Sequence, residues 1–162
     1  MTIDPGTKIG HVHLTVANLD RALAFYRDVL GFEVTTQYGR EAVFLSAGGY
    51  HHHVALNTWA GEGAPAPAPG TTGLYHFAIL YPDRKALAKA LKRVLDNGIA
   101  LEGASDHGVS EAIYLSDPDG NGVELYRDRP DEEWPRTEDG EIAMVSDPID
   151  LEQLLKEAPA SS

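Results

Sequence analysis

The chain is 162 residues long and 43% hydrophobic, which suits one domain with a sizeable core or a pair of small modules. It contains no cysteine, and this excludes disulfide bonds and thiolate metal ligands. The net charge of −12 is unevenly spread, since residues 1–130 hold 15 acidic and 11 basic side chains and residues 131–162 hold 10 and 2. An acidic chain without a basic stripe argues against nucleic acid and anionic membranes as partners.

No apolar run reaches the length of a membrane span, and the N-terminal segment lacks the basic and apolar regions of a signal peptide. We therefore expect a soluble, cytoplasmic protein that does not act at a membrane. A small molecule or another protein is the expected partner.

The first 60 residues predict one module with the order strand, helix and three strands. Residues 11–16 alternate as a strand does, and residues 18–31 carry apolar side chains at helical spacing, with Asn18 or Asp20 as the cap and Gly31 at the end. Three further strands are expected at 32–38, 42–49 and 51–59, the last two joined by a glycine turn. The module is therefore of the form βαβββ.

The same order of elements recurs after a Pro-, Gly- and Ala-rich linker at 61–73. In the second module, residues 74–130, we expect one amphipathic helix at 82–98. The four expected strands are at 75–81, 99–105, 111–117 and 122–128. Phe44-Leu45-Ser46 matches Tyr114-Leu115-Ser116, and Val54-Ala55-Leu56 matches Val123-Glu124-Leu125. Two copies of one module are the simplest explanation.

Two such modules would pair into one curved sheet around a shared cavity, giving an α+β fold. His11 opens the first strand of one module, His76 stands at the equivalent position of the other, and Glu124 lies in its last strand. Two imidazoles and one carboxylate form the facial triad that binds Fe(II) and leaves positions open for substrate and dioxygen; Mn(II) accepts the same ligands. Ala55, which matches Glu124, adds no fourth ligand and keeps the metal site open.

Three consecutive histidines precede Ala55. Strand alternation alone would place His51 and His53 on the face of Ala55, whereas His52 would need a bulge at the preceding glycines to turn inward. His13, two residues after the first expected ligand, should face the same cavity. For His13 and His53 taken alone, a structural role and a functional role fit equally well.

Several phrases of the sequence together resemble a known family. They are HVHLTV and LDRALAFYRDVLGF near the start, YHFAI, and HGVSEAIYLSDPDGNGVELY, arranged on the two-module plan over about residues 8–130. These phrases resemble the vicinal oxygen chelate superfamily (glyoxalase, bleomycin resistance protein and dioxygenase) and, within it, type I extradiol dioxygenases of the catechol 2,3-dioxygenase kind. The resemblance implies the vicinal oxygen chelate fold.

The resemblance also implies roles for individual residues. His11, His76 and Glu124 would hold the metal, and His52 would be the active-site acid and base. His107 would lie near dioxygen and the substrate, Tyr114 would hydrogen-bond a substrate oxygen, and His13 would take the substrate-side polar position; these three and His52 are the catalytic candidates. Family members often carry two histidines before the small residue and this chain carries three, so His51 and His53 remain alternatives to the favoured His52.

The activity that the resemblance implies is Fe(II)-dependent cleavage of a catechol-type or hydroquinone substrate by O2. A catechol would give a product of the muconic semialdehyde type, and the family implies a homodimer. On the same scaffold, a glyoxalase-type lyase would use four ligands, against which Ala55 speaks. An epimerase or thiol transferase has less reason to carry His107 and Tyr114, and a non-enzymatic antibiotic-binding resistance protein needs no metal.

The acidic residues 131–162 form a C-terminal tail with apolar anchors such as Trp134 and Leu154. We expect this tail to pack on the domain or on a second subunit, with its last few residues disordered. The segment DPDGNG at 117–122 is expected to be a tight turn, because it lacks the length and the closing glutamate of a calcium loop.

Overall fold

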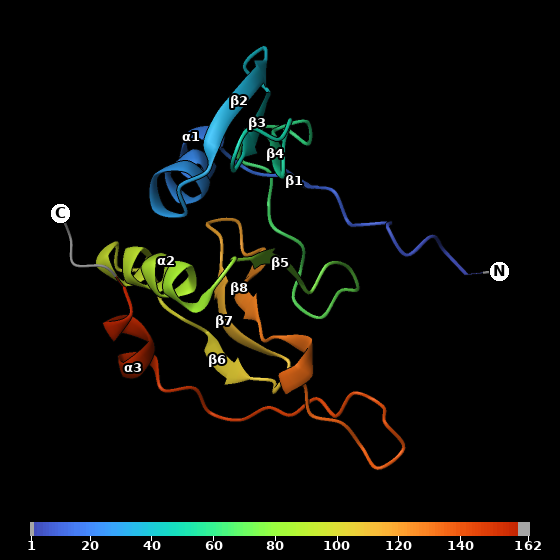
Figure 1. Ribbon diagram of the computed structural model, residues 1–162. Coiled ribbons are helices and arrows are strands. Elements are labelled where there is room, and N and C mark those ends of the chain that lie inside the picture. The colour runs from blue at the N-terminus through green and yellow to red at the C-terminus, as the bar shows by residue number, and fades with distance from the viewer. Residues whose placement is uncertain (1, 159–162) are drawn as a thin grey trace. The chain divides into compact units, whose positions relative to one another are not determined.

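A computed structural model describes residues 2–158, and the expected disorder of the last few residues lies outside that range. The chain divides into two compact units, Met1–Ala68 and Pro69–Ser162 (Figure 1). Each unit contains one four-stranded mixed sheet and its own helices, so the α+β class and the two βαβββ modules are confirmed. The pairing of the two sheets around a metal cavity stays a prediction.

In the first unit, the strand order is β1-β4-β3-β2, with β1 parallel to β4 and the other neighbours antiparallel. Its elements are β1 (Val12–Thr15), α1 (Leu19–Leu23), η1 (Ala24–Val29), β2 (Glu33–Tyr38), β3 (Ala42–Ser46) and β4 (Val54–Asn57). Val43, Leu45, Val54 and Leu56 are almost fully buried in the centre of this sheet. The core of the unit is therefore formed by the interior strands β3 and β4 together with the helical segment, from which Phe25 and Tyr26 are also buried.

The expected helix at 18–31 consists of two parts. The Asn18 side chain accepts the backbone N–H of Arg21 at 2.8 Å and begins α1, as a helix cap does. From Ala24 the turns widen into the π-helix η1, where the Leu30 N–H reaches back five residues to the Phe25 carbonyl at 2.9 Å. The apolar spacing predicted a helix here but not this change of turn.

The expected strand at 51–59 is shorter than predicted, and the argument from alternation for the histidine run is therefore wrong. The His53 N–H donates to the Leu45 carbonyl and the His53 carbonyl accepts from Val12, so His53 lies at the end of the ladder and β4 begins at Val54. His51 and His52 lie outside any strand and need no bulge to change face. The register shift in this sheet lies instead in β2.

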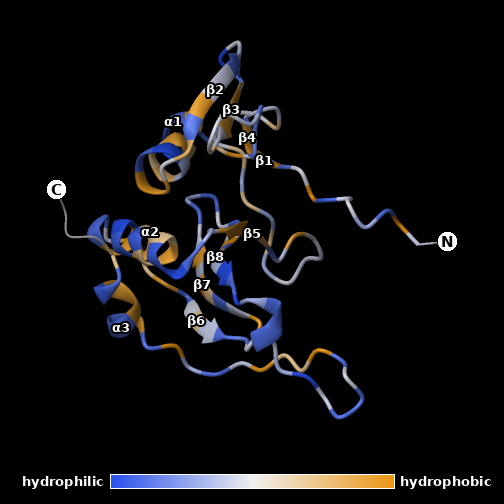
Figure 2. Cartoon of the chain, viewed as in Figure 1, coloured by the Kyte–Doolittle hydropathy of each residue, from blue (hydrophilic) through white to orange (hydrophobic). Residues whose placement is uncertain are grey.

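In the second unit, the strand order is β5-β8-β7-β6, again with one parallel pair, β5 and β8. Its elements are β5 (His76–Leu80), α2 (Arg84–Asp96), β6 (Gly103–Asp106), β7 (Ser110–Ser116), β8 (Gly122–Asp128), η2 (Asp131–Glu133) and α3 (Leu151–Lys156). Asp83 caps α2 by accepting the Ala86 N–H at 2.7 Å. The α2 ribbon carries both hydrophilic and hydrophobic residues, as an amphipathic helix does (Figure 2).

The segment after β8 packs on the second unit. The Trp134 indole N–H donates to the Arg129 carbonyl at 2.8 Å, and Asp147 forms a β-bridge with Asp106 at the end of β6. Farther on, α3 lies against α2 and buries Leu154 completely. The turn between β7 and β8 is tied by Asp117, whose carboxylate accepts the N–H groups of Asp119 and Asn121 at 2.9 Å each, so this carboxylate serves the turn.

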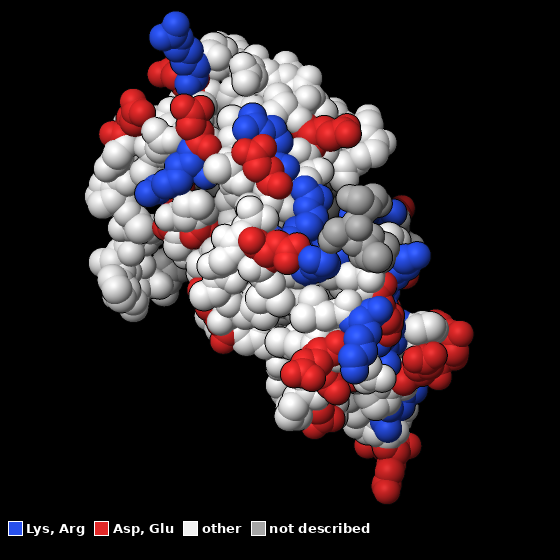
Figure 3. Space-filling model, turned by 90° about the vertical axis from the view of Figure 1, so that its left-hand side faces the viewer, with Lys and Arg blue, Asp and Glu red and all other residues white. Residues whose placement is uncertain are grey.

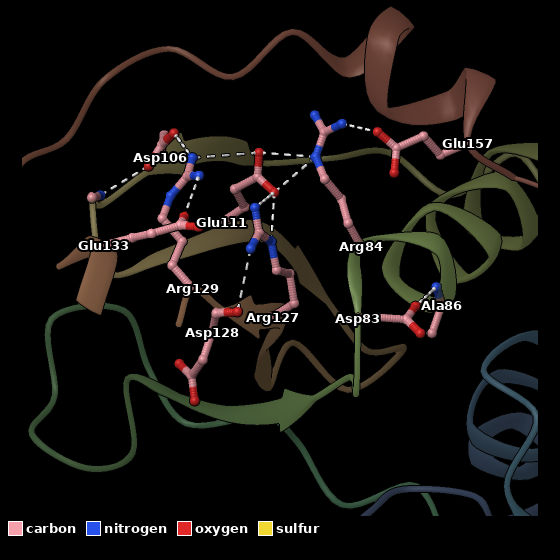
Figure 4. Close-up of polar contacts among 11 residues, drawn as sticks. Asp83, Arg84, Ala86, Asp106, Glu111, Arg127, Asp128, Arg129, Glu133 and Glu157 are labelled. Carbon is pink, nitrogen blue, oxygen red and sulfur yellow. Dashed lines mark hydrogen bonds and ion pairs between the residues drawn. The ribbon is translucent and has the colours of Figure 1, made fainter. Parts of the chain in front are cut away.

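A buried carboxylate links these elements on the side of the sheet that carries α2. Glu111, only 5% exposed in its side chain, accepts from Arg84 at 2.9 Å and from Arg127 at 2.6 Å (Figure 4). Arg84 also pairs with Glu157 just after α3, and Arg129 pairs with Asp106. These charge-assisted bonds join α2, β7, β8 and the C-terminal tail.

Figure 3 shows basic and acidic side chains lying next to one another on the surface in that view. None of the helices over residues 2–158 has the length and hydropathy needed to cross a membrane.

Candidate metal centre and its polar surroundings

The strand register of the second unit brings three site candidates together. His76 is the first residue of β5 and pairs with Gly122 of β8. Glu124 lies two residues farther along β8, where it pairs with Tyr114 of β7 on the other side. Because strand side chains alternate, Glu124 and Tyr114 share one face of the sheet, opposite to the buried Leu125 and Leu115.

The closest polar contact of this group joins His76 and Glu124. The imidazole Nε2 lies 2.9 Å from the Glu124 Oε2, and the two side chains are 31% and 12% exposed. Two donors that each lie about 2.1 Å from one cation at a right angle are about 3.0 Å apart, so this spacing fits neighbouring metal ligands. The other nitrogen, Nδ1 of His76, is buried and has no hydrogen-bond partner among residues 2–158.

Tyr114 and His107 extend the group away from Glu124. The Tyr114 hydroxyl lies 2.7 Å from Nε2 of His107 and 3.4 Å from Oε1 of Glu124, and Nδ1 of His107 lies 2.8 Å from the Val145 carbonyl oxygen. Burial, together with the negative charge of Glu124, raises the pKa of Tyr114 to about 12. The phenol therefore keeps its proton at neutral pH.

The first unit brings together another set of candidates. The rings of His11 and His52 have centroids 4.3 Å apart, and the His52 ring meets Phe44 at 5.2 Å. Phe44 and His13 stand on either side of the fully buried Ala55 in the strand register. His52 thus lies beside His11 and Phe44, and His13 stands next to Ala55; their roles at a site stay a prediction.

The histidines of the first unit differ in their partners. Nε2 of His13 accepts from the Asn57 amide at 3.0 Å, and Nδ1 of His53 lies 3.1 Å from the Ser46 hydroxyl and 3.2 Å from the Ala47 N–H. His53 is therefore engaged in holding the end of β4. Nδ1 of His51 lies 2.7 Å from Nδ1 of His52.

Desolvation, followed by repulsion from His11 and His51, lowers the pKa of His52 from its usual 6.5. His52 is therefore largely neutral at pH 7, in the state that accepts a proton.

Neither unit, over the described residues 2–158, brings three His, Asp or Glu side chains into a metal-binding group of its own. The expected triad takes His11 from one unit and His76 and Glu124 from the other, and it stays a prediction. Sequence reasoning missed Asn57, although alternation from Ala55 would have placed both on one face of β4. It also missed the Val145 carbonyl, for which the sequence holds no signal.

The two βαβββ units and the histidine, tyrosine and glutamate side chains on their sheets are features by which a class of proteins is recognised. Comparison with known families identifies that class. Residues 8–125 match the model of the Glyoxalase/Bleomycin resistance protein/Dioxygenase superfamily. The chain therefore belongs to this superfamily. The crystal structure of a glyoxalase/dioxygenase from Nostoc punctiforme shares the fold with a TM-score of 0.65 at 21% identity, over 80% of this chain and 98% of that one.

Two curated relatives are dioxygenases by name. A catechol-2,3-dioxygenase of Bacillus subtilis (strain 168) is 46% identical over 97% of this chain and 54% of its own length. Biphenyl-2,3-diol 1,2-dioxygenase 3 of Rhodococcus globerulus is 37% identical over 79% of this chain and 66% of its own length. The chain thus spans between about half and two thirds of these relatives.

Proposed function

We propose that this protein is an Fe(II)-dependent extradiol dioxygenase that cleaves a catechol-type substrate with O2 to a product of the muconic semialdehyde type. The observation that carries the proposal is the 2.9 Å pair of His76 and Glu124 beside the Tyr114–His107 hydrogen bond. The 46% identity with a catechol-2,3-dioxygenase supports it. A homodimer in the cytoplasm is part of the same proposal.

His11, His76 and Glu124 are the residues that would hold the metal, which is Fe(II), with Mn(II) as the alternative that accepts the same ligands. When bound, the ion acts as a Lewis acid toward both diol oxygens and couples their electrons to dioxygen. Ala55 contributes only a methyl group, which leaves coordination positions for the diol and O2. This ligand count separates the proposal from a four-ligand lyase.

The surrounding residues supply binding and proton transfer. Neutral His52 is able to accept a hydroxyl proton from the incoming diol and to return it later, as an acid and base does. Tyr114 keeps its proton, donates it in a hydrogen bond to Nε2 of His107, and its oxygen would accept a hydrogen bond from a substrate hydroxyl. His13, held by Asn57, lines the substrate side.

The overall reaction balances without a further reductant. One ring carbon–carbon bond next to the diol breaks, and both atoms of O2 enter the product as an aldehyde oxygen and a carboxylate oxygen. The electrons come from the diol itself. The protein therefore needs only a diol, O2 and the divalent metal.

The test is anaerobic purification, loading with Fe(II), and addition of catechol or a substituted diol while O2 uptake and the yellow product are recorded. We expect one O2 consumed per diol, and loss of turnover by at least about 100-fold in Glu124→Gln, which keeps the shape but weakens the ligand. Absence of O2 uptake by folded, iron-loaded protein with all diols tried would contradict the proposal. Consumption of methylglyoxal with glutathione would instead identify a lyase.

A further inference from the structure

A segment beyond the second module lies against the turn that carries His107. The Val145 N–H donates to the His107 carbonyl at 3.1 Å, and Asp147 exchanges two backbone hydrogen bonds with Asp106, at 2.8 and 2.9 Å. The Val145 carbonyl in turn lies 2.8 Å from Nδ1 of the His107 ring. The segment is therefore fixed beside the imidazole by its backbone.

Gly108 gives a second, independent sign that the turn is built to receive this segment. Its φ of +75° is a conformation that glycine adopts without strain. A Cβ at this position would lie 2.7 Å from Cγ of Pro135 and 3.3 Å from a methyl carbon of Val145. The space over the turn is thus taken by side chains of the C-terminal tail.

We propose that Val145 is a positioning residue whose backbone carbonyl fixes the neutral His107 imidazole as the Nδ1–H tautomer. A carbonyl oxygen only accepts hydrogen bonds, so the nitrogen that faces it must carry the proton. Nε2 of the neutral ring is then an acceptor, and it faces the Tyr114 hydroxyl at 2.7 Å. A histidine side chain in water prefers the opposite tautomer, so the tail reverses the intrinsic preference of the ring.

The tautomer decides where the single proton of Tyr114 points. With an acceptor at 2.7 Å and Glu124 at 3.4 Å, the hydroxyl donates to His107. Oε1 of Glu124 is then left without a strong donor and keeps its lone pairs for a cation. This consequence rests on the proposed function, whereas the tautomer itself does not.

Imidazole 15N shifts in 15N-histidine-labelled, metal-free protein at about pH 8, above the usual histidine pKa, test the inference. His107→Gln assigns the signals by their loss. We expect a protonated Nδ1 and a bare Nε2 in the wild type. Any other pattern there overturns the inference, and this arm needs no variant that alters folding.

The second arm uses Val145→Pro combined with Asp147→Pro, which removes the two N–H groups that hold the segment to His107 and Asp106. The His107 signals should move toward the Nε2–H tautomer. Met144→Pro is the matched control in an exposed neighbour and should keep the wild-type pattern. Wild-type shifts in the double variant would overturn the inference.

A third arm compares turnover. In the double variant, Tyr114 should donate to Glu124 instead, so Fe(II) affinity and kcat for catechol should each fall about 10-fold. If the wild-type protein cleaves no diol, the proposed function fails, and the tautomer measurement still decides the role of Val145.

Discussion

The two units share one strand register and differ in what they place on it. In the first unit Phe44 stands opposite Ala55, and in the second Tyr114 stands opposite Glu124 at the equivalent positions. A hydrocarbon ring and a methyl group in one unit thus correspond to a phenol and a carboxylate in the other. The repeated module places two residues opposite each other at equivalent positions in both units. Only the second unit has polar, hydrogen-bonding side chains at those positions.

The number of possible metal ligands depends on both equivalent positions, because Ala55 offers no carboxylate and Glu124 offers one. A symmetric pair of modules would offer two carboxylates and two histidines, a four-ligand set that would leave a six-coordinate iron one position fewer than a chelating diol and O2 need. The chain has one carboxylate at these two positions, and under the proposed function this would be the carboxylate count of an open iron site. The difference between the units therefore carries the proposed choice between ring cleavage and lyase chemistry.

The largest effect is expected when the asymmetry is removed. Ala55→Glu adds the missing carboxylate, so turnover of catechol should fall by about 100-fold or more while Fe(II) is still bound. Ala55→Gln is the matched control, because it overpacks the same buried position by about 1–3 kcal/mol without adding a charge. O2 uptake and calorimetric Fe(II) titration measure both quantities. Equal turnover in the Glu and Gln variants would show that Ala55 does not control an open position.

A smaller effect is expected when the aromatic pair is made alike. Tyr114→Phe gives the second unit the residue found at Phe44 and removes the donor to His107, so kcat should fall by about 10-fold to 100-fold. The mirror variant Phe44→Tyr should leave kcat within about 2-fold, since it removes no existing hydrogen bond. Steady-state kinetics with catechol decide this, and a larger loss in the mirror variant would contradict the assigned roles.

The smallest effect concerns two aspartates, one in each unit. Burial opposes ionisation of Asp106, but the Gly108 N–H and Arg129 outweigh it and lower its pKa below the usual 3.8. A lowered pKa means that the stabilisation is fully present above pH 3.8 and is lost as the pH falls through the folded-state value. Asp106→Asn should therefore cost about 0.5–1 kcal/mol at neutral pH, and the cost should vanish in acid.

Asp28 is the matched control in the first unit. Arg27 lowers its pKa as well, but the pair is fully exposed to solvent, so Asp28→Asn should leave stability unchanged. Urea unfolding between neutral and acid pH measures both variants. An equal loss of stability in the two would contradict the role given to the buried contacts of Asp106.

Much of this fold could be predicted because the local signals agree. The amphipathic pattern of residues 82–98 predicted α2, and the matching phrases around Phe44 and Tyr114 predicted the repeat. The start of β4 could not be predicted, because the backbone bonds that end the ladder at His53 come from Leu45 and Val12, which are distant in sequence. The alternation of apolar and polar residues in the sequence does not show which backbone groups His53 will bond to.

The candidate site was predictable to a similar degree. Glu124 in β8 and His13 in β1 could each be assigned to one face of a strand, because side chains alternate between the two faces along a strand. A contact between an imidazole and a peptide carbonyl 38 residues later carries no side-chain signature, so the role of Val145 emerged only from the structure.

One further feature constrains how His76 is held. A Cβ on Gly122 would lie 2.3 Å from the Tyr75 carbonyl oxygen and 3.0 Å from Cβ of His76, closer than packed atoms approach. Even an alanine there would force β5 and β8 apart at the end where they begin. The orientation of the His76 side chain therefore depends on the lack of a side chain at residue 122 of the adjacent strand. Adding a single methyl group there would displace the imidazole.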